Sequence, residues 1–406
     1  MKVVVVWILG GWLTLIVLVS VGLMIATKFR KVKRDRISLE YPHMDPVSVG
    51  VGSRSRATTY TFGEPLYEAM LETIESATKR IFFETYILKG DSVGRRFKQA
   101  LSEAAERGVE VFVVYDGFAN LVVRRRFFRF PPAIHVLRFP VLRLTFRILS
   151  PRVWGRDHRK ILAVDDRVAF VGGYNIGAPY ATDWRDTHLR LEGEAVWELV
   201  NAFVDFWNVH ASGPQLEDRG APSWDPSVRS HRNVPSQLTY PIRTMYLEAI
   251  DRANSTILLT AAYFLPDRDI LAALTAAARR RVKIQILLPR ISNHVVADWL
   301  ARGYFSELLA AGVRIHRYKG WMVHAKTITI DGVWSSVGTA NIDRMSLTGN
   351  YEINLEIHSP ELAEHLTAVF AKDVTNSDEL TADEWDRRFV GKKACEWLLR
   401  PLRPLL

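Results

Sequence analysis

The sequence predicts a duplicated α/β fold of two lobes, preceded by one transmembrane helix. Helical and apolar segments alternate in the same order in each half of the chain, and one set of polar residues recurs at the same spacing in each. The third observation is an uncharged stretch at residues 3–26. As a helix it reaches ~36 Å, which exceeds a hydrocarbon core of ~30 Å.

The first half begins with residues 64–80, where apolar side chains follow helical spacing, and continues into the apolar run 81–88. A second amphipathic segment at 91–107 leads to a second apolar run at 109–116. Helix, strand, helix and strand in this order predict parallel strands joined by helical crossovers.

The second half repeats this order with a helix at 241–254, a strand at 256–264, a helix at 267–281 and a strand at 282–289. Between the halves, residues 213–240 are rich in proline and glycine, which predicts an inter-lobe connection. The predicted organisation is an anchor at 1–27, a basic juxtamembrane linker at 28–57, a first lobe at 58–212, the connection at 213–240, a second lobe at 241–375 and an amphipathic segment at 376–406.

The amino-terminal stretch is predicted to be an uncleaved anchor. A signal peptide is the alternative, but its apolar region is usually only ~7–15 residues long, and no A-x-A cleavage site follows here. Residues 28–36 carry six lysines and arginines, whereas only Lys2 precedes the stretch. The positive-inside rule therefore predicts a single-pass cell-membrane protein with its body in the cytoplasm.

The polar residues of the two halves agree at six offsets from a histidine. The first copy is His158, Lys160, Asp165, Gly172, Asn175 and Asp186, and the second is His324, Lys326, Asp331, Gly338, Asn341 and Glu352. The alternative is that these polar residues were retained after the duplication without a function. This interpretation is weaker, because a buried strand does not require histidine or lysine.

The three charged residues that open each copy form the candidate catalytic set: His158, Lys160, Asp165, His324, Lys326 and Asp331. Histidine and lysine, two residues apart in a predicted strand, share a face. Each aspartate falls in the turn that follows, so turn capping is the preferred role for both. Candidate phosphate-binding residues after the second strand are Gly173, Asn175, Thr339 and Asn341.

Two lobes packed about a pseudo-twofold axis would bring two histidines, two lysines and two asparagines together. A phosphodiester between them would offset the repulsion of the ammonium groups. Metal ligation is less favoured, because each histidine has a lysine two residues away and carboxylates are few. One histidine can attack phosphorus while the other protonates the leaving alcohol. Asp186 and Glu352 are suited to orient the rings.

These motifs, H-x-K-x4-D twice with GG-x-N and G-T-x-N continuations, resemble the phospholipase D superfamily and, more narrowly, bacterial cardiolipin synthases. Matching stretches include RGVEVFVVYDG, HRKILAVDDRVAFVGGYNIG, WRDTHLRLEG and HAKTITIDGVWSSVGTANID. The resemblance covers most of residues 58–375 and implies the two-lobed phospholipase D fold.

The resemblance also implies a function. Two phosphatidylglycerols would give cardiolipin and glycerol through a phosphatidyl-histidine, without a metal or other cofactor. His158 is implied as the nucleophile and His324 as the acid and base, although the symmetry of the halves permits the reverse. A hydrolytic phospholipase D, or another phosphodiesterase such as a nuclease, is the alternative. A non-catalytic lipid-binding protein is a third reading.

The net charge of +10 is concentrated in two places, at 28–36 and at 121–160. In the second, arginines alternate with bulky apolar residues, which suits a surface in the lipid head-group layer. A nucleic-acid groove also uses arginine and aromatic residues, but the anchor favours a phospholipid partner at a membrane and no nucleic acid. The segment 376–406 is predicted either to contact the membrane or to pack on the second lobe.

Overall fold

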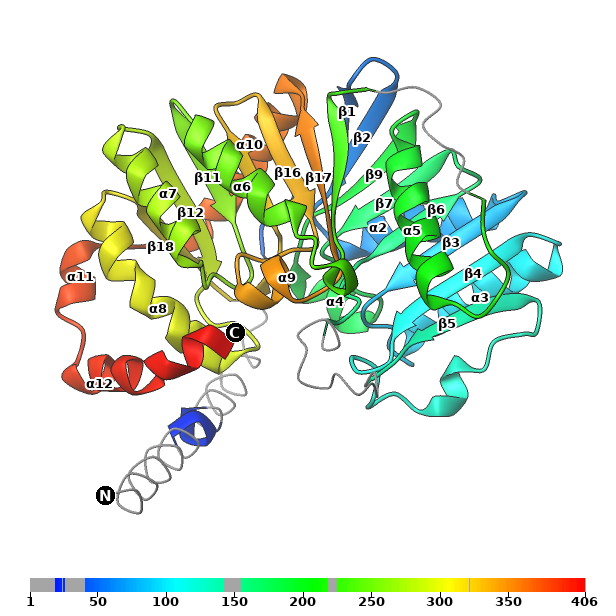
Figure 1. Cartoon of the computed structure of the whole chain (residues 1–406), viewed down its shortest axis with the longest axis horizontal. Helices are drawn as coiled ribbons and strands as arrows, with labels where there is room; N and C mark the ends of the chain where they lie inside the picture. Colours follow the sequence, from blue (N-terminus) through cyan, green and yellow to red (C-terminus); the bar gives the residue numbers. More distant parts are fainter. Residues whose placement is uncertain are drawn as a thin grey trace.

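The computed structural model describes residues 19–23, 25, 41–141, 155–217, 225–320 and 322–405. The predicted membrane span at 3–26 and the basic flank at 28–36 lie almost entirely outside this part of the chain. Within the described ranges, no helix is both long enough and apolar enough to cross a membrane. The body consists of two mixed α/β halves that lie side by side (Figure 1).

The described residues form two eight-stranded sheets. The first has the order β1 (Val47–Val51), β2 (Ser55–Tyr60), β9 (His188–Gly193), β7 (Val168–Gly172), β6 (Ile161–Val164), β3 (Arg80–Thr85), β4 (Glu110–Asp116) and β5 (Ile134–Phe139). The second has the order β10 (Val228–Asn233), β17 (Glu352–His358), β16 (Trp334–Gly338), β15 (Thr327–Ile330), β11 (Thr256–Thr260), β12 (Lys283–Pro289), β13 (Arg314–Tyr318) and β18 (Ser377–Leu380).

The duplicated alternation predicted from the sequence is confirmed by the pairing of these strands. β3 runs parallel to β4, as β11 runs parallel to β12. β6 and β7 form an antiparallel pair, as do β15 and β16. The six strands from β9 to β5 therefore have the same order as the six from β17 to β13.

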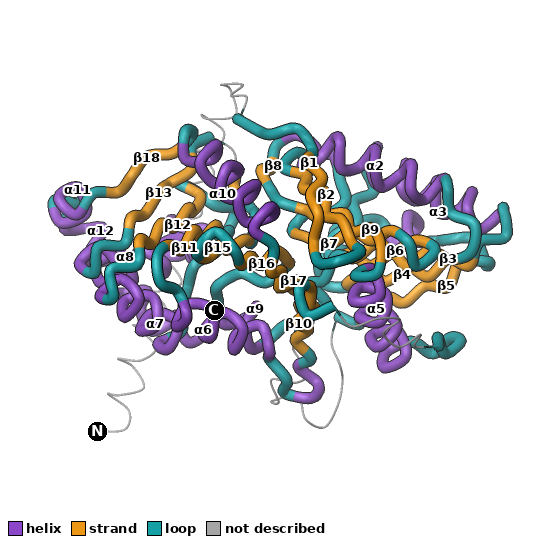
Figure 2. Tube along the Cα trace, turned by 90° about the horizontal axis from the view of Figure 1, so that it is seen from above, coloured by secondary structure: helices purple, strands orange, loops and turns teal. Residues whose placement is uncertain are grey.

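Helices cover both faces of each sheet. The first half contains α2 (Gly63–Glu75), α3 (Ser92–Glu106), α4 (Ala178–Thr182) and α5 (Val196–His210), and the second contains α6 (Pro241–Arg252), α7 (Arg268–Arg279), α8 (Val295–Ala310), α9 (Arg344–Thr348) and α10 (Pro360–Val374). Aspartates at equivalent places, Asp91 and Asp267, cap the crossover helices α3 and α7 by accepting backbone N–H groups. Figure 2 shows α2 and α3 on one side of the molecule and α6, α7 and α8 on the other.

An apolar core joins the two halves. Phe203 and Trp207 of α5 belong to the same buried cluster as Ile353 and Leu355 of β17 and Leu362 of α10. Separate clusters lie under α2 and α3 and under α6, α7 and α8. Because close-packed side chains resist displacement, this shared core fixes the relative position of the two sheets, and the site depends on that position.

Three predicted segment boundaries need correction. The linker predicted at 28–57 includes β1 and the start of β2, and the connection predicted at 213–240 includes β10, which pairs with β17. β18 lies within the segment predicted at 376–406 and pairs with β13. Edge strands were missed because they are short and rich in polar residues, so they lack the apolar runs that identified the central strands.

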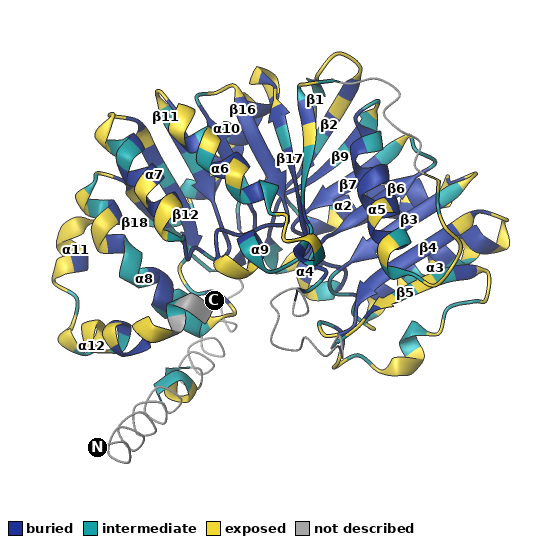
Figure 3. Ribbon diagram, viewed as in Figure 1, coloured by how far each residue is buried: buried dark blue, intermediate teal, exposed yellow. Residues whose placement is uncertain are grey.

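The carboxy-terminal segment packs on the second half through α11 (Ala382–Asp386) and α12 (Val390–Leu399), followed by the 3-10 turn η4 (Arg400–Leu405). Leu398 and Leu399 of α12 form a cluster with Leu300 of α8, and Val19 and Leu23 of the described amino-terminal helix contact this cluster. The opposite side of α12 is largely exposed (Figure 3). The prediction that this segment packs on the second lobe is therefore confirmed for one face of α12 only.

The arginine-rich segment of the first half also differs from its prediction. The 3-10 turn η1 (Arg125–Phe128) directs Phe127 and Phe128 onto the core cluster of α2 and α3, and Phe128 stacks on Tyr115 with a centroid separation of 4.2 Å. Among the described residues of this segment, the large exposed apolar side chains are those of Leu121, Val122 and Val136, and Phe118 lies just before them. Residues 142–154 of this segment lie outside the described part.

Candidate active site between the two halves

The two motif histidines lie just before equivalent central strands. His158 precedes β6 and His324 precedes β15. Their side chains are only 13% and 6% exposed. Each histidine, with its lysine, thus lies just before a central strand of its sheet and not within the strand as predicted.

Two bridges across the halves bring the second part of each motif to the other histidine. β8 (Trp184–Arg185) of the first half pairs with β14 (Met322–Val323) of the second, directly before His324. In the reciprocal bridge, Asp157 pairs with Tyr351, and the His158 N–H donates to the Tyr351 carbonyl at 3.0 Å. The carboxylate that follows each bridge therefore reaches the histidine of the opposite half.

The resulting hydrogen bonds between histidine and carboxyl group cross between the halves. Nδ1 of His158 lies 2.9 and 3.0 Å from the two carboxylate oxygens of Glu352. Nδ1 of His324 lies 2.6 Å from Oδ2 of Asp186. Because a carboxylate occupies Nδ1 of each ring, Nε2 is the nitrogen available for chemistry. Neither half contains a complete site alone.

The two carboxyl groups have opposite pKa shifts. Burial would raise the pKa of Asp186, but the charges of Lys326 and His324 and the hydrogen bonds from His324 and the Thr187 N–H outweigh it and lower this pKa to about 2. Burial raises the pKa of Glu352 to about 8, and the charge of Lys160 and the Thr339 hydroxyl oppose this only in part. The two histidines therefore have partners that differ in charge at neutral pH.

The lysines of both motifs converge on the same place. Lys160 Nζ donates to the His158 carbonyl at 2.6 Å, and Lys326 Nζ lies 2.9 Å from Nδ1 of His324. Burial lowers the pKa of Lys160 to about 7 and that of Lys326 to about 8. Burial and the nearby lysines also lower the pKa of both histidines, for His324 to about 3. Such a group of buried cationic and neutral bases is suited to an anionic ligand.

The asparagines remain candidates for phosphate binding. Oδ1 of Asn175 accepts the Ile87 N–H at 3.2 Å, which leaves its Nδ2 as the donor for a ligand. Oδ1 of Asn341 is buried and has no hydrogen-bond partner among the described residues. Both residues are 3% exposed. The Nδ2 group of each is the part that can donate to a phosphate oxygen, whereas the Oδ1 of Asn341 can only accept.

Gly173 and Thr339 support the carboxylates, which corrects their predicted role in phosphate binding. A Cβ atom at Gly173 would lie 2.1 Å from Oδ1 of Asp186, so only glycine leaves room for that carboxylate. Thr339 donates its hydroxyl to Glu352 at 2.5 Å. The backbone N–H of each position already donates to a carbonyl of the neighbouring strand, at 3.0 Å for Gly173 and 2.9 Å for Thr339. No donor of either residue is left for a ligand.

Asp165 and Asp331 do not belong to the site, although they were grouped with the catalytic candidates. Each lies at the far end of the strand that its histidine precedes. Asp165 accepts the backbone N–H groups of Thr78, Lys79 and Arg80, and Asp331 accepts those of residues 254–256. Hydrogen bonding lowers the pKa of both against the opposing effect of burial. Their observed contacts are those of the turn-capping role.

Aromatic side chains around the histidines were not predicted. The ring of Tyr86 lies 4.7 Å from that of His158, and the ring of Trp184 lies 4.8 Å from that of His324. Tyr263 approaches His324 to 6.3 Å. One signal was available, since Tyr86 and Tyr263 lie shortly after β3 and β11, the strands that pair with the strands following the two histidines.

A buried ionic network distinguishes the His158 side from the His324 side. The Arg159 guanidinium binds Glu84 at 2.6 Å and lies 3.7 Å from Asp157. The strand pairing makes Thr260 equivalent to Glu84, and the second half has the apolar Val323 and Ala325 at the places of Asp157 and Arg159. Removal of one member would leave an uncompensated buried charge, so this network holds the His158 segment rigidly.

Comparison with known proteins assigns the family. A family model described as "Cardiolipin synthase, PLD-like domain" matches residues 70–207 and 246–374. A cardiolipin synthase of Staphylococcus aureus is 32% identical over 366 residues, covering 86% of this chain and 73% of that protein. One from Clostridium perfringens is 30% identical over 398 residues, covering 92% of this chain and 83% of that protein.

The fold has relatives among solved structures. The crystal structure of phosphatidylserine synthase from Haemophilus influenzae superposes with a TM-score of 0.67 at 13% identity, covering 86% of this chain and 93% of that one. At this identity the likeness concerns the fold. The identity to curated relatives, with the duplicated site, carries the assignment further: this chain belongs to the cardiolipin synthase family of PLD-like proteins and is a phospholipase D-type phosphatidyltransferase.

Proposed function

We propose that the protein makes cardiolipin from two phosphatidylglycerols through a phosphatidyl-histidine. The observation that carries the proposal is the pair of buried histidines, each held at Nδ1 by a carboxylate from the other half, beside two lysines. The names of the curated relatives support the substrate. The lysines and asparagines would donate hydrogen bonds to the two non-bridging oxygens of a phosphodiester bound between the halves.

In the first step, Nε2 of His158 attacks phosphorus, and the bond from phosphorus to the glycerol oxygen breaks. Nε2 of His324 gives its proton to that oxygen, so glycerol leaves neutral. In the second step, His324 takes the proton of the acceptor hydroxyl, whose oxygen attacks phosphorus. The P–N bond then breaks and both histidines return to their initial state.

The difference between the two carboxyl groups favours this division of roles. A general acid must carry a proton before the leaving group departs. Burial and Lys326 lower the pKa of His324 to about 3, so the negative phosphodiester, together with an ionised carboxylate, must stabilise that imidazolium. Asp186, which is ionised at neutral pH, holds His324. His158 must begin neutral to attack, and its partner Glu352 has the raised pKa. We therefore assign His158 as the nucleophile and His324 as the acid and base.

Purified full-length protein in phosphatidylglycerol vesicles is expected to release glycerol and form cardiolipin in equal amounts. Chromatography of the labelled lipids measures the product, and an enzymatic glycerol assay measures the leaving group. Phosphatidic acid as the sole lipid product would establish the hydrolytic alternative. Cleavage of labelled DNA or RNA without lipid turnover would establish a nuclease.

The proposal includes contact of the body with the membrane through α12. Phe389, Val390 and Trp397 are 75%, 74% and 62% exposed, and Lys392 and Lys393 lie between them. Exposed aromatic side chains with adjacent lysines suit the head-group layer of an anionic bilayer. The described amino-terminal helix contacts the buried face of the same α12 cluster, which would place α12 beside the predicted anchor.

A label on Cys395, the only cysteine of the chain, tests this contact, because it lies in α12 and is partly exposed. With the protein in phosphatidylglycerol vesicles, a fluorophore there is expected to be quenched by lipids brominated along the acyl chain. The control carries the label on Arg252→Cys in a Cys395→Ser background, at an 81% exposed side chain of α6. Equal quenching at the two positions would contradict contact through α12.

A further inference from the structure

A cleft of about 710 Å³ opens in the second half, outside the histidine site. Its floor is formed where β11, β12 and β13 end, and its walls are α8, α11 and Lys392 of α12. The carboxyl ends of neighbouring parallel strands are the usual place for a ligand in an α/β sheet. The volume falls within the ~300–1,000 Å³ that is typical of ligand pockets.

The cleft lies next to the candidate active site, although His324 is not among its lining residues. Tyr263, one of its lining residues, has its ring 6.3 Å from that of His324. Lys319 and Gly320 line the cleft and lie in the short stretch of chain that leads to His324. A ligand in the cleft would therefore have one end near the histidine that we assign as acid and base.

The lining of the cleft carries more positive than negative charge. Five lining residues are cationic and two are acidic: Arg290, Arg302, Arg317, Lys319 and Lys392 against Asp298 and Glu384. Three of the cations also pair with acids outside the lining, Arg290 and Lys319 with Asp378 and Arg302 with Glu396. Arg317 pairs with Glu384 at 3.0 Å, yet its Nε is buried without a hydrogen-bond partner among the described residues. Burial raises the pKa of Asp298 to about 6, so this acid is still mostly ionised at pH 7. A buried guanidinium nitrogen and this excess of cations suit an anion.

The remaining lining is apolar and aromatic. The Arg302 guanidinium lies 4.6 Å from the ring of Trp299 and 5.4 Å from that of Trp385. Phe305 and Leu288 line the cleft as well. A cationic site with apolar walls, next to the exposed aromatic residues of α12, is complementary to a phospholipid whose chains enter from a bilayer.

We propose that this cleft binds the acceptor phospholipid by its phosphate and presents its free glycerol hydroxyl to His324. The inference rests on the proposed function. The acceptor differs from water or free glycerol in carrying a negative phosphodiester, so cations beside the site would favour it over neutral alcohols. Its hydroxyl oxygen attacks phosphorus, its proton passes to His324, and the bond from phosphorus to His158 breaks.

The double variant Arg317→Gln, Lys319→Gln tests the proposal in the full-length protein. Both side chains are partly exposed, at 24% and 42%, and both pair with partly exposed acids, Glu384 and Asp378. Two reactions of the same donor are compared in phosphatidylglycerol vesicles. One is cardiolipin formation, which needs the anionic acceptor, and the other is exchange of labelled glycerol into phosphatidylglycerol, which needs a neutral one.

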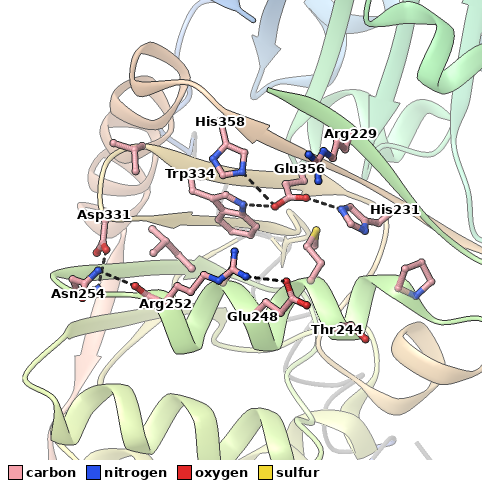
Figure 4. Close-up of a pocket in the computed structure, with 15 residues that line it drawn as sticks. Arg229, His231, Thr244, Glu248, Arg252, Asn254, Asp331, Trp334, Glu356 and His358 are labelled. Carbon is pink, nitrogen blue, oxygen red and sulfur yellow. Dashed lines mark hydrogen bonds and ion pairs between the residues drawn. The ribbon is translucent and has the colours of Figure 1, made fainter. Parts of the chain in front are cut away.

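We expect cardiolipin formation to fall at least about tenfold in the double variant, the effect of losing ~1.4 kcal/mol of acceptor binding. Glycerol exchange is expected to stay within twofold of the wild type, which also shows that the variant folds. Arg252→Gln is the matched control, because Arg252 lines a different hollow and pairs with Glu248 there (Figure 4). It should leave both reactions unchanged.

Equal losses in the two reactions, or no loss in either, would overturn the acceptor site and leave the proposed function standing. A wild-type protein that only hydrolyses phosphatidylglycerol would overturn the proposed function, and the acceptor site with it. The two failures are therefore distinguishable in one set of assays.

Discussion

Replacement of His158 by asparagine is expected to lower phosphatidyl transfer by at least about 10⁴-fold and to prevent any covalent adduct. Removal of the nucleophile from a catalytic triad has effects of this size or larger, because the remaining groups only bind and orient the substrate. His324→Asn is expected to lower turnover with natural lipid to a similar extent, since the leaving glycerol would receive no proton.

An activated donor separates the two roles. In a phosphatidyl ester of p-nitrophenol, the leaving group departs without a proton. His324→Asn is therefore expected to release one equivalent of nitrophenol in a burst and to retain the phosphatidyl group on His158. Intact-protein mass spectrometry measures the adduct, and peptide mapping locates it.

The pattern of adducts decides the mechanism. His158→Asn should give none with either donor. An adduct on His324 in His158→Asn would show that the roles are reversed, and a fully active variant at either position would disprove the two-histidine mechanism. The control is His358→Asn, because His358 is 55% exposed and belongs to the second-half hollow outside the site.

The sequence predicts the duplicated core well because duplication repeats independent signals. The apolar runs that became β3, β4, β11 and β12 were separated by amphipathic segments of helical length, and both halves agreed. Agreement of six polar offsets then located the two histidines. These features depend on local spacing, which a single sequence contains.

The crossed contacts between histidine and carboxyl group could not be predicted in the same way. Equal offsets placed Asp186 in the motif of His158, yet its carboxylate holds His324, because β8 pairs with β14 of the other half. Strand pairing between halves depends on the shape of the shared core rather than on local spacing. The same reason applies to Thr339, whose hydroxyl is taken by Glu352.

Asparagine in place of Asp186 is expected to cost about 10⁴-fold in kcat/KM at pH 7, whereas Glu352→Gln should cost less than tenfold. Oδ2 of Asp186 lies 2.6 Å from Nδ1 of His324, and Oδ1 accepts the Thr187 N–H at 2.7 Å. The asparagine amide has one oxygen to accept from these two donors. Its NH₂ group would therefore face the other N–H, which disfavours the His324 tautomer that carries its proton on Nδ1. A triad aspartate replaced in this way loses about 10⁴-fold.

Glutamine fits the surroundings of Glu352 much better. Its carbonyl can accept the His158 Nδ1–H, and its NH₂ can donate to the Thr339 hydroxyl oxygen, 2.5 Å from the present carboxyl oxygen. Thr339 can then donate to the Ile353 carbonyl at 3.2 Å. With a pKa of about 8, Glu352 is protonated at pH 6, and the amide resembles that state.

The pH dependence of the activity lost in Asp186→Asn and in Glu352→Gln distinguishes the two carboxyl groups. Above pH 8 the wild-type Glu352 loses its proton, and its carboxylate then makes Nε2 of His158 a stronger nucleophile, which glutamine cannot do. The ratio of wild-type to Glu352→Gln activity should therefore rise between pH 6 and 9. Asp186 has a pKa of about 2 and is ionised throughout, so the ratio for Asp186→Asn should stay flat. Comparable losses for both variants at pH 6, with equal thermal stability, would contradict this assignment. The carboxyl groups would then act equivalently, and the electrostatic basis for making His324 the acid would be lost.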